Sequence, residues 1–247
     1  MSALAHYLEE EGVPSVAISL IRLHTEKVAP PRALWVPFEL GRPISAPNDA
    51  QFQTSVVTAA LRLLEAAPGP VVLQDFPNDD PMAIDLPGWQ PPFDLEAGAL
   101  EIGNRAALED ALRQEAQAIA PFYERFVAAN RRTTMGLSGL GLDDCVGLLA
   151  AWLSGAPPTG ADTAVRPVQA LRWAVDDLKA YYFEAMSADG AIPSSRQMQS
   201  WFWDRTLVAQ AIIALRKGLL VSEDARSQAV GRMNLMPGVQ VLRLGLS

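Results

Sequence analysis

The stretch that decides the fold is Ala33-Leu34-Trp35-Val36-Pro37-Phe38-Glu39-Leu40-Gly41-Arg42-Pro43. Its first half is a short apolar run of the kind that forms a strand buried on both faces of a parallel sheet. The run ends in a turn, rich in proline and glycine, that carries one acid, Glu39, and one base, Arg42. This pattern indicates a buried strand that delivers a polar loop to a site.

Further elements follow on both sides of this strand. A β-branched apolar run at 13–21 and a shorter one at 71–73 predict two more strands. Helical patterns are predicted at 3–11, for one turn at 24–28, and from a capping Asn48 to Glu65. Strands that alternate with helices over so short a distance predict a small parallel, Rossmann-like α/β unit over residues 1–75.

The chain changes character after this unit. Residues 76–103 are rich in proline and aspartate and predict a long irregular connection. From Asn104 to the end at 247, apolar residues recur at three- and four-residue spacing, which predicts a mainly α-helical domain. Residues 239–244 are the exception, because their apolar run indicates a strand or an arm. The predicted fold is therefore an α/β N-terminal unit followed by a helical half.

Composition narrows the classes of function. The chain has 247 residues and a formal net charge of -8, which argues against nucleic acid as a partner. No apolar run approaches the roughly 20 residues that span a bilayer, and the acidic N-terminus does not resemble a signal peptide. The single cysteine, Cys145, excludes an internal disulfide and a Cys-x-x-Cys motif, and we expect it to lie in the core. These features favour a cytoplasmic protein without a membrane partner.

Polar side chains follow each predicted strand at its carboxyl end. His24 follows the first strand, Glu39 and Arg42 follow the second, and Asp75 follows the third. Ligands of parallel α/β sheets bind beyond the carboxyl ends of the strands, so we expect these side chains to share a cleft.

Each of these residues suggests a role. His24, Glu39 and Asp75 are candidate catalytic residues for acid–base work, and a histidine with carboxylates can also hold a hard metal ion. Arg42 suits a carboxylate or phosphate, and Gly41 shapes the turn beside it. The simpler interpretation is that polar residues follow every strand because loops are exposed to solvent.

Two other features bear on ligands. Trp203 falls off the predicted apolar stripe of its helix, so it is a candidate to line a substrate pocket or an oligomer interface. The sequence contains neither Gly-x-Gly-x-x-Gly nor Gly-Lys-Ser/Thr, so no nucleotide cofactor is predicted and the cofactor is left open.

The order of a helix, the segment Glu11-Gly12-Val13-Pro14-Ser15-Val16 and the turn Pro37-Phe38-Glu39-Leu40-Gly41-Arg42-Pro43 carries a family resemblance. Residues 3–66 resemble the B subunits of the reductases that act on glycine, sarcosine, betaine and D-proline. In that family a helix, a Gly-Ile-Pro-type strand and a Pro-x-x-Leu-Gly-x-Pro turn occur in this order. The reactive selenocysteine or cysteine pair of the family precedes the helix, where this chain has Met1-Ser2-Ala3 and no thiol.

The resemblance implies the fold of the segment and a role for the turn around Gly41, without the thiol chemistry. The first hypothesis is therefore an enzyme or enzyme subunit of oxidoreductase type that binds a small polar or anionic ligand, with a partner protein as a source of redox groups. The alternatives are a non-catalytic binding or assembly protein and a metal-dependent enzyme that uses His24 and nearby carboxylates. We also expect a homo-oligomer.

Overall fold

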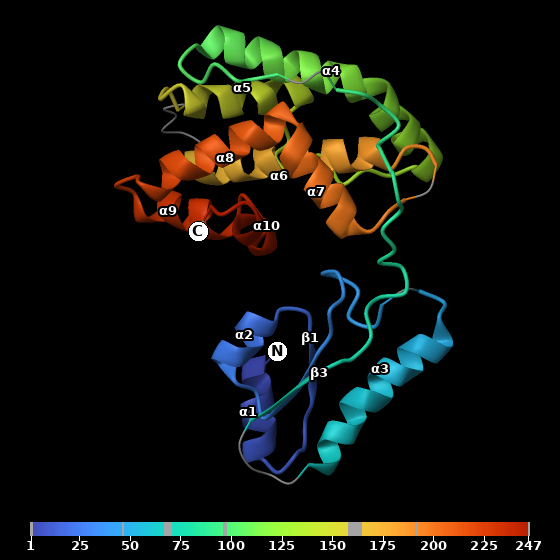
Figure 1. Ribbon diagram of the computed structural model, residues 1–247. Helices are drawn as coiled ribbons and strands as arrows, with labels where there is room; N and C mark the ends of the chain where they lie inside the picture. Colours follow the sequence, from blue (N-terminus) through green and yellow to red (C-terminus); the bar gives the residue numbers. More distant parts are fainter. Residues whose placement is uncertain are drawn as a thin grey trace. The chain divides into compact units, whose positions relative to one another are not determined.

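The computed structural model describes residues 2–45, 47–66, 71–95, 98–157, 165–190 and 192–246 (Figure 1). The chain forms two compact units, Met1–Asp85 and Leu86–Ser247. The change of unit therefore falls inside the Pro- and Asp-rich segment at 76–103.

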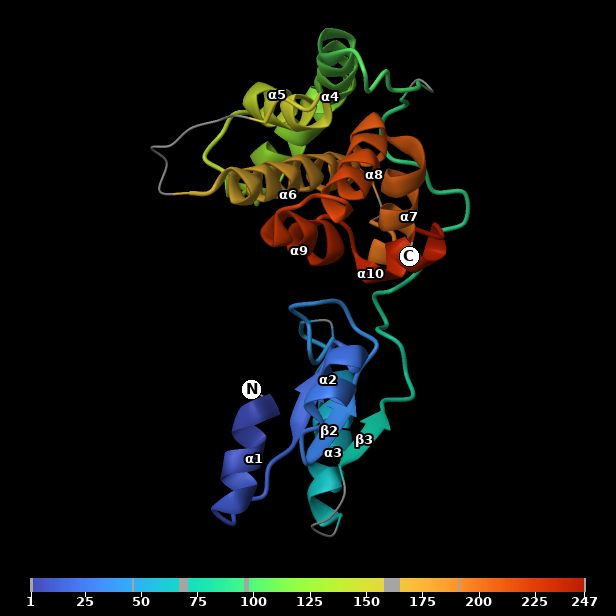
Figure 2. The same cartoon turned by 90° about the vertical axis from the view of Figure 1, so that its left-hand side faces the viewer.

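The N-terminal unit is a parallel sheet with interleaved helices. Its strands are β1 (Ala17–Ser19), β2 (Arg32–Trp35) and β3 (Val72–Asp75), in the spatial order β1-β2-β3. Its helices are α1 (Ser2–Glu10), α2 (Arg22–Val28), α3 (Ala50–Arg62) and the short 3-10 helix η1 (Leu63–Glu65). Figures 1 and 2 show α2 and α3 on opposite faces of the sheet. The predicted parallel α/β unit is confirmed.

The core of this unit lies between β2 and α3. Leu34 and Val36 are completely buried and pack with Val56 of α3. Three phenylalanines, Phe38, Phe52 and Phe76, close the core with ring centroids 5.7–5.9 Å apart. Because Phe76 directly follows β3 and Phe38 lies shortly after the end of β2, this cluster holds together the segments that leave the sheet.

A partly buried ion pair ties α1 to the start of β2. Arg32, whose side chain is only 5% exposed, contacts Glu9 and also donates to the carbonyl of Ala66. The backbone N–H of Ser15 donates to the same carboxylate at 2.6 Å. The Ser15 hydrogen bond and the Arg32 guanidinium hold the pKa of Glu9 below its usual value.

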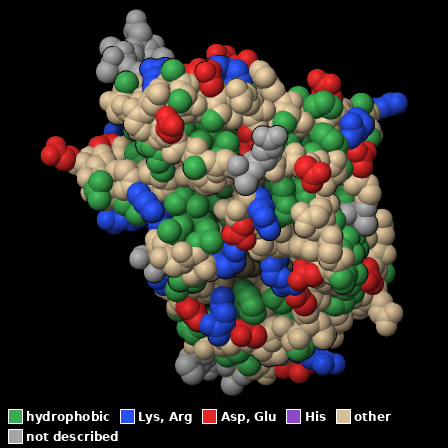
Figure 3. All heavy atoms as spheres, turned by 45° about the horizontal axis from the view of Figure 1, so that its top comes forward, with side chains coloured by type: hydrophobic (Ala, Val, Ile, Leu, Met, Phe, Trp, Pro, Cys, Tyr) green, Lys and Arg blue, Asp and Glu red, His purple; other side chains and the backbone are tan. Residues whose placement is uncertain are grey.

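The second unit is mainly helical, as predicted. Its helices are α4 (Arg105–Asn130), α5 (Leu142–Leu153), α6 (Pro167–Met186), α7 (Ser195–Arg205), α8 (Leu207–Leu220), α9 (Ala225–Met233) and α10 (Gly238–Arg243). One apolar core joins these helices. None of the described helices is long and apolar enough to cross a membrane. Figure 3 shows acidic and basic side chains interspersed with apolar ones on the face in view.

Two boundaries differ from the sequence-based prediction. Helix α3 is capped by Asp49, whose carboxylate accepts from the N–H of Phe52 at 2.9 Å, and not by Asn48. Asn48 instead has a positive φ of 67°, in the left-handed region that asparagine tolerates. Residues Gly238–Arg243 form helix α10 and not a strand, because Val241 is buried while Val239 and Leu242 are exposed.

Two carboxylates of α6 hold the loop between α4 and α5. Asp177 accepts hydrogen bonds from the N–H groups of Gly136, Leu137 and Ser138 at 2.8–2.9 Å. Burial alone would raise the pKa of Asp177, but these bonds and the Ser138 hydroxyl hold it below its usual value. Seven residues further along α6, Glu184 accepts hydrogen bonds from Thr133 and Thr134 at 2.6–2.7 Å.

A third carboxylate, Glu115 of α4, caps α8 from a distance. It accepts from the N–H of Leu207 at 2.7 Å, from the N–H of Val208 at 3.1 Å and from the Tyr182 hydroxyl at 2.7 Å. These N–H groups lie in the first turn of α8 and have no partner within the helix. Burial nevertheless raises the pKa of Glu115, and the three hydrogen bonds oppose the rise only in part.

We expect Glu115→Gln to lower the free energy of unfolding by about 1–3 kcal/mol, because one amide oxygen cannot serve donors on both sides of the group. In the folded protein the pKa of Glu115 lies above the usual glutamate value of 4.5, whereas in the unfolded chain it has that usual value. The advantage of the wild type should therefore be fully present below pH 4.5 and be lost as the pH rises through the raised pKa of Glu115. Urea unfolding across this range, with exposed Glu124→Gln as control, measures it. An advantage that grows with pH contradicts the assignment.

Candidate ligand site at the carboxyl edge of the sheet

The register of the sheet brings the ends of its three strands level. Ser19 lies opposite Trp35, and Trp35 lies opposite Asp75. All three strands are parallel, so this edge is the carboxyl edge, and the segments after the strands leave from it. It is the edge at which parallel α/β sheets bind ligands.

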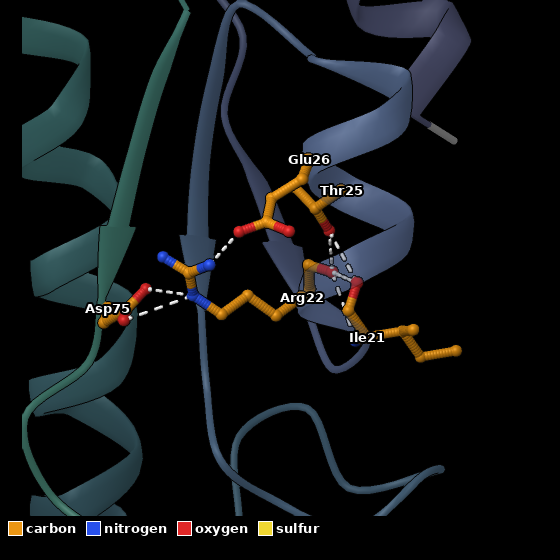
Figure 4. A network of polar contacts seen from close by, with 6 residues as sticks. Ile21, Arg22, Thr25, Glu26 and Asp75 are labelled. Atoms are coloured by element: carbon orange, nitrogen blue, oxygen red, sulfur yellow. Dashed lines mark hydrogen bonds and ion pairs between the residues drawn. The ribbon is translucent and has the colours of Figure 1, made fainter. Parts of the chain in front are cut away.

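Arg22 spans this edge from α2 to β3 (Figure 4). Its Nε donates to the two carboxylate oxygens of Asp75 at 3.1 and 3.3 Å, and its Nη1 contacts Glu26 one turn along α2. Because β2 lies between β1 and β3, the side chain passes across the end of the central strand. One guanidinium thus connects the helix after the first strand to the end of the last.

Hydrogen bonds of Thr25 hold the start of α2, where Arg22 lies. Thr25, only 1% exposed, donates through Oγ1 to the carbonyl of Ile21 at 3.0 Å and shares a hydrogen bond with the Ser19 hydroxyl. These contacts anchor the turn between β1 and α2, and Figure 4 shows the one between Thr25 and Ile21. The backbone that carries Arg22 is therefore held while its side chain remains accessible.

The Arg22 network is exposed to solvent. The side chains of Arg22, Asp75 and Glu26 are 44%, 49% and 42% exposed. Exposed ion pairs contribute about 0–1 kcal/mol, so either carboxylate can be displaced at little cost. An arginine fork can bind a carboxylate or phosphate through two parallel N–H groups, whereas Asp75 receives only the Nε–H of Arg22. The arrangement can therefore bind a small anion by exchange of partners.

The structure brings Asp75 into this network but places His24 elsewhere. His24 is exposed on α2 and makes no hydrogen bond or ion pair with any described residue. Residues two apart on a helix are turned about 200° from one another, so His24 and Arg22 point to different sides of α2. His24 and Asp75 are therefore not joined by a described contact.

The turn after β2 lies at the same end of the sheet. The N–H of Arg42 donates to the carbonyl of Glu39 at 3.0 Å, and Gly41 has a φ of +90°, which suits glycine. Glu39, Gly41 and Arg42 are all exposed. The Ser45 hydroxyl donates to Asp80 at 2.7 Å, which ties this loop to the segment after β3. The Arg42 guanidinium makes no ion pair with a described residue and is accessible to a ligand.

Trp203 belongs to the other unit and is a core residue. It is only 3% exposed, packs against Phe202 with ring centroids 5.1 Å apart, and donates through Nε1 to Gln199 at 2.9 Å. The expectation that it lies off the apolar stripe is wrong, because α7 is packed on more than one side. So little of the ring is exposed that a ligand would have to displace neighbouring side chains to reach it.

The described residues contain no group of three His, Cys, Asp or Glu side chains arranged to hold a metal ion. Cys145 is buried in α5, as predicted, with its Sγ 3.6 Å from the Ser138 hydroxyl. Burial raises the pKa of the Cys145 thiol above its ordinary value, which keeps it protonated at neutral pH.

Comparison with models of known protein families, with curated proteins and with solved structures found no match.

Sequence reasoning missed Arg22, the central group of the site. The predicted first strand at 13–21 ends immediately before Arg22, and no role was predicted for this residue. The available signal was its spacing to Glu26, because an arginine and a glutamate four residues apart at the start of a helix form a local pair. The contact with Asp75 joins positions 53 residues apart and needs the strand order, which no local pattern contains.

We expect Asp75→Asn to change the free energy of unfolding by about 1 kcal/mol or less, because the ion pair that it removes is exposed. Chemical denaturation monitored by circular dichroism measures this. A loss of several kcal/mol would show that the network is structural and not a displaceable site.

We expect Cys145 in the native protein to react with a thiol reagent far more slowly than in the unfolded protein, because the thiol is buried and protonated. Titration at pH 8, with and without denaturant, compares the two states. Rapid labelling of the native protein would contradict this placement.

Proposed function

We propose that the carboxyl edge of the N-terminal sheet binds a small polar or anionic molecule, with Arg22 as the group that holds the anion. The observation that supports this is the exposed guanidinium shared between Asp75 and Glu26 across the sheet edge. A ligand carboxylate has only to replace a weak surface partner. Arg42 and the turn at Gly41 supply a second cation and accessible backbone at the same end.

We further propose that the chain is an enzyme or enzyme subunit of oxidoreductase type. This step rests on the resemblance of residues 3–66 to the amino-acid reductase B subunits. Those enzymes use thiols or selenols, whereas the one cysteine here is buried. The redox group would therefore come from a partner protein, and Asp75 and Glu39 are the acids available near the edge. A cytoplasmic location and a homo-oligomeric state belong to this proposal.

The second candidate is a non-catalytic binding or assembly protein. The position of His24 favours this candidate. His24 is turned away from Arg22, so the ionisable groups described at the carboxyl edge of the sheet are carboxylates and arginines. A neighbouring gene for a short protein with a Cys or selenocysteine motif would favour the split enzyme. The metal-dependent alternative is tested by elemental analysis of the purified protein.

Calorimetric titration tests the binding step. Glycine, sarcosine, betaine, D-proline and inorganic phosphate serve as probes. We expect at least one of them to bind at millimolar concentration, and Arg22→Ala to abolish that binding without unfolding the protein. Arg42→Ala should weaken the same binding, because its side chain is exposed and carries little of the core.

Arg62→Ala is the matched control. Arg62 ends α3, which runs back from the carboxyl edge, so it lies toward the opposite edge of the sheet. Its removal takes away the same charge and should leave binding unchanged. If no probe binds, or if Arg62→Ala weakens binding as much as Arg22→Ala, the proposed site is wrong.

A further inference from the structure

The helical unit contains a groove of about 730 Å³ that is separate from the sheet edge. Its described walls are the C-terminal end of α5, with Trp152 and Leu153, and the outer side of α8, with Ile213 and Ala214. The volume falls in the range of small-molecule sites, and the lining is mostly apolar, as in such sites.

One face of α8 runs along this groove. Gln210, Ile213 and Ala214, then Lys217 and Gly218, recur at three- and four-residue spacing and all line it. Positions with this spacing lie on one side of a helix. Seven residues separate the first from Lys217, a length of about 10 Å along the axis. The groove therefore follows α8 past Lys217 as far as Leu219 and Ser222, so its cation lies partway along an otherwise mostly apolar wall.

Gly218 borders open space in the wall of this groove. It lies inside α8, where glycine is less favourable than alanine by about 1 kcal/mol in helix propensity. Its backbone does not require glycine, and a Cβ built there would meet nothing within 4 Å. By contrast, a Cβ at Gly231 of α9 would lie 3.1 Å from the Cβ of Leu219, so close packing explains that glycine. At Gly218 a side chain would enter only open space at the groove.

Lys217 gives the groove its charge. It is the one ionisable side chain among the described lining residues, it is exposed, and it makes no ion pair with a described residue. The end of α5 nearby does not need a cation. The N–H of Ala156 donates to the carbonyl of Ala151, and that of Gly155 to Trp152, which satisfies two of the last carbonyls of the helix.

We propose that this groove binds an apolar carboxylate of the fatty-acid class, with the chain along α8 and the carboxylate at Lys217. The apolar length, the absent side chain at Gly218 and the free cation each fit one part of such a molecule. The site lies within the helical unit and does not depend on the function proposed for the sheet edge.

Calorimetric titration with octanoate and with octanol tests the two halves of the proposal. The wild type should bind octanoate more tightly than octanol. Gly218→Trp should weaken octanoate binding by about tenfold or more, because the indole fills the groove. Ala214→Phe fills the same groove from the adjacent turn and serves if Gly218→Trp fails to fold. Lys217→Met should weaken octanoate by about threefold, as befits an exposed ion pair, and leave octanol unchanged.

Three controls make the outcome decisive. Gly218→Ala should keep octanoate binding and raise the thermal midpoint by about 2–4 °C, because alanine is the better helix former. Lys27→Met removes an equivalent lysine from the last turn of α2 and should change nothing. Trp152 lies in the wall of the groove, so octanoate should change the tryptophan fluorescence of the wild type but not that of Trp152→Phe. Binding that survives both groove-filling variants overturns the site, and equal affinity for octanol overturns the choice of an anion.

Discussion

The N-terminal unit depends on the removal of β2 from water. It is the central strand, paired on both sides, and its residues Ala33 and Leu34 are completely buried. An apolar strand in this position forces neighbours onto both edges, because its backbone N–H and C=O groups must be paired when they are buried. The level carboxyl edge and the position of Arg22 above it both follow from this pairing.

In the helical unit, side-chain carboxylates accept hydrogen bonds from backbone N–H groups that have no partner within a helix. Glu115 accepts from the first turn of α8, while Asp177 and Glu184 accept from the loop between α4 and α5. Each carboxylate belongs to one element and satisfies the backbone of another. The same device produces opposite electrostatic results, because four short hydrogen bonds outweigh burial at Asp177 whereas burial prevails at Glu115.

The sequence predicted the fold class because hydrophobic periodicity is local. The run before Pro37 and the three-four spacing after Asn104 each report how one segment meets a core. The site was predicted less completely, since it depends on which segments become neighbours. Asp75 was named correctly as a strand-end residue, but its partner Arg22 was not, and His24 turned out to lie on another side of α2. Trp203 was misplaced because a helical wheel assumes one buried face, and α7 is packed on more than one.

The brevity of the strands has a consequence for how the protein behaves at high concentration. Within the described residues, β1 and β3 form the two margins of the sheet, with three and four residues respectively. A strand at a margin offers unpaired backbone groups that can template pairing with another molecule. Edge strands this short offer few hydrogen bonds to another molecule, and the charge of Asp75 at the end of β3 disfavours pairing there. The small size of the sheet therefore also acts as a guard against self-association through strand pairing.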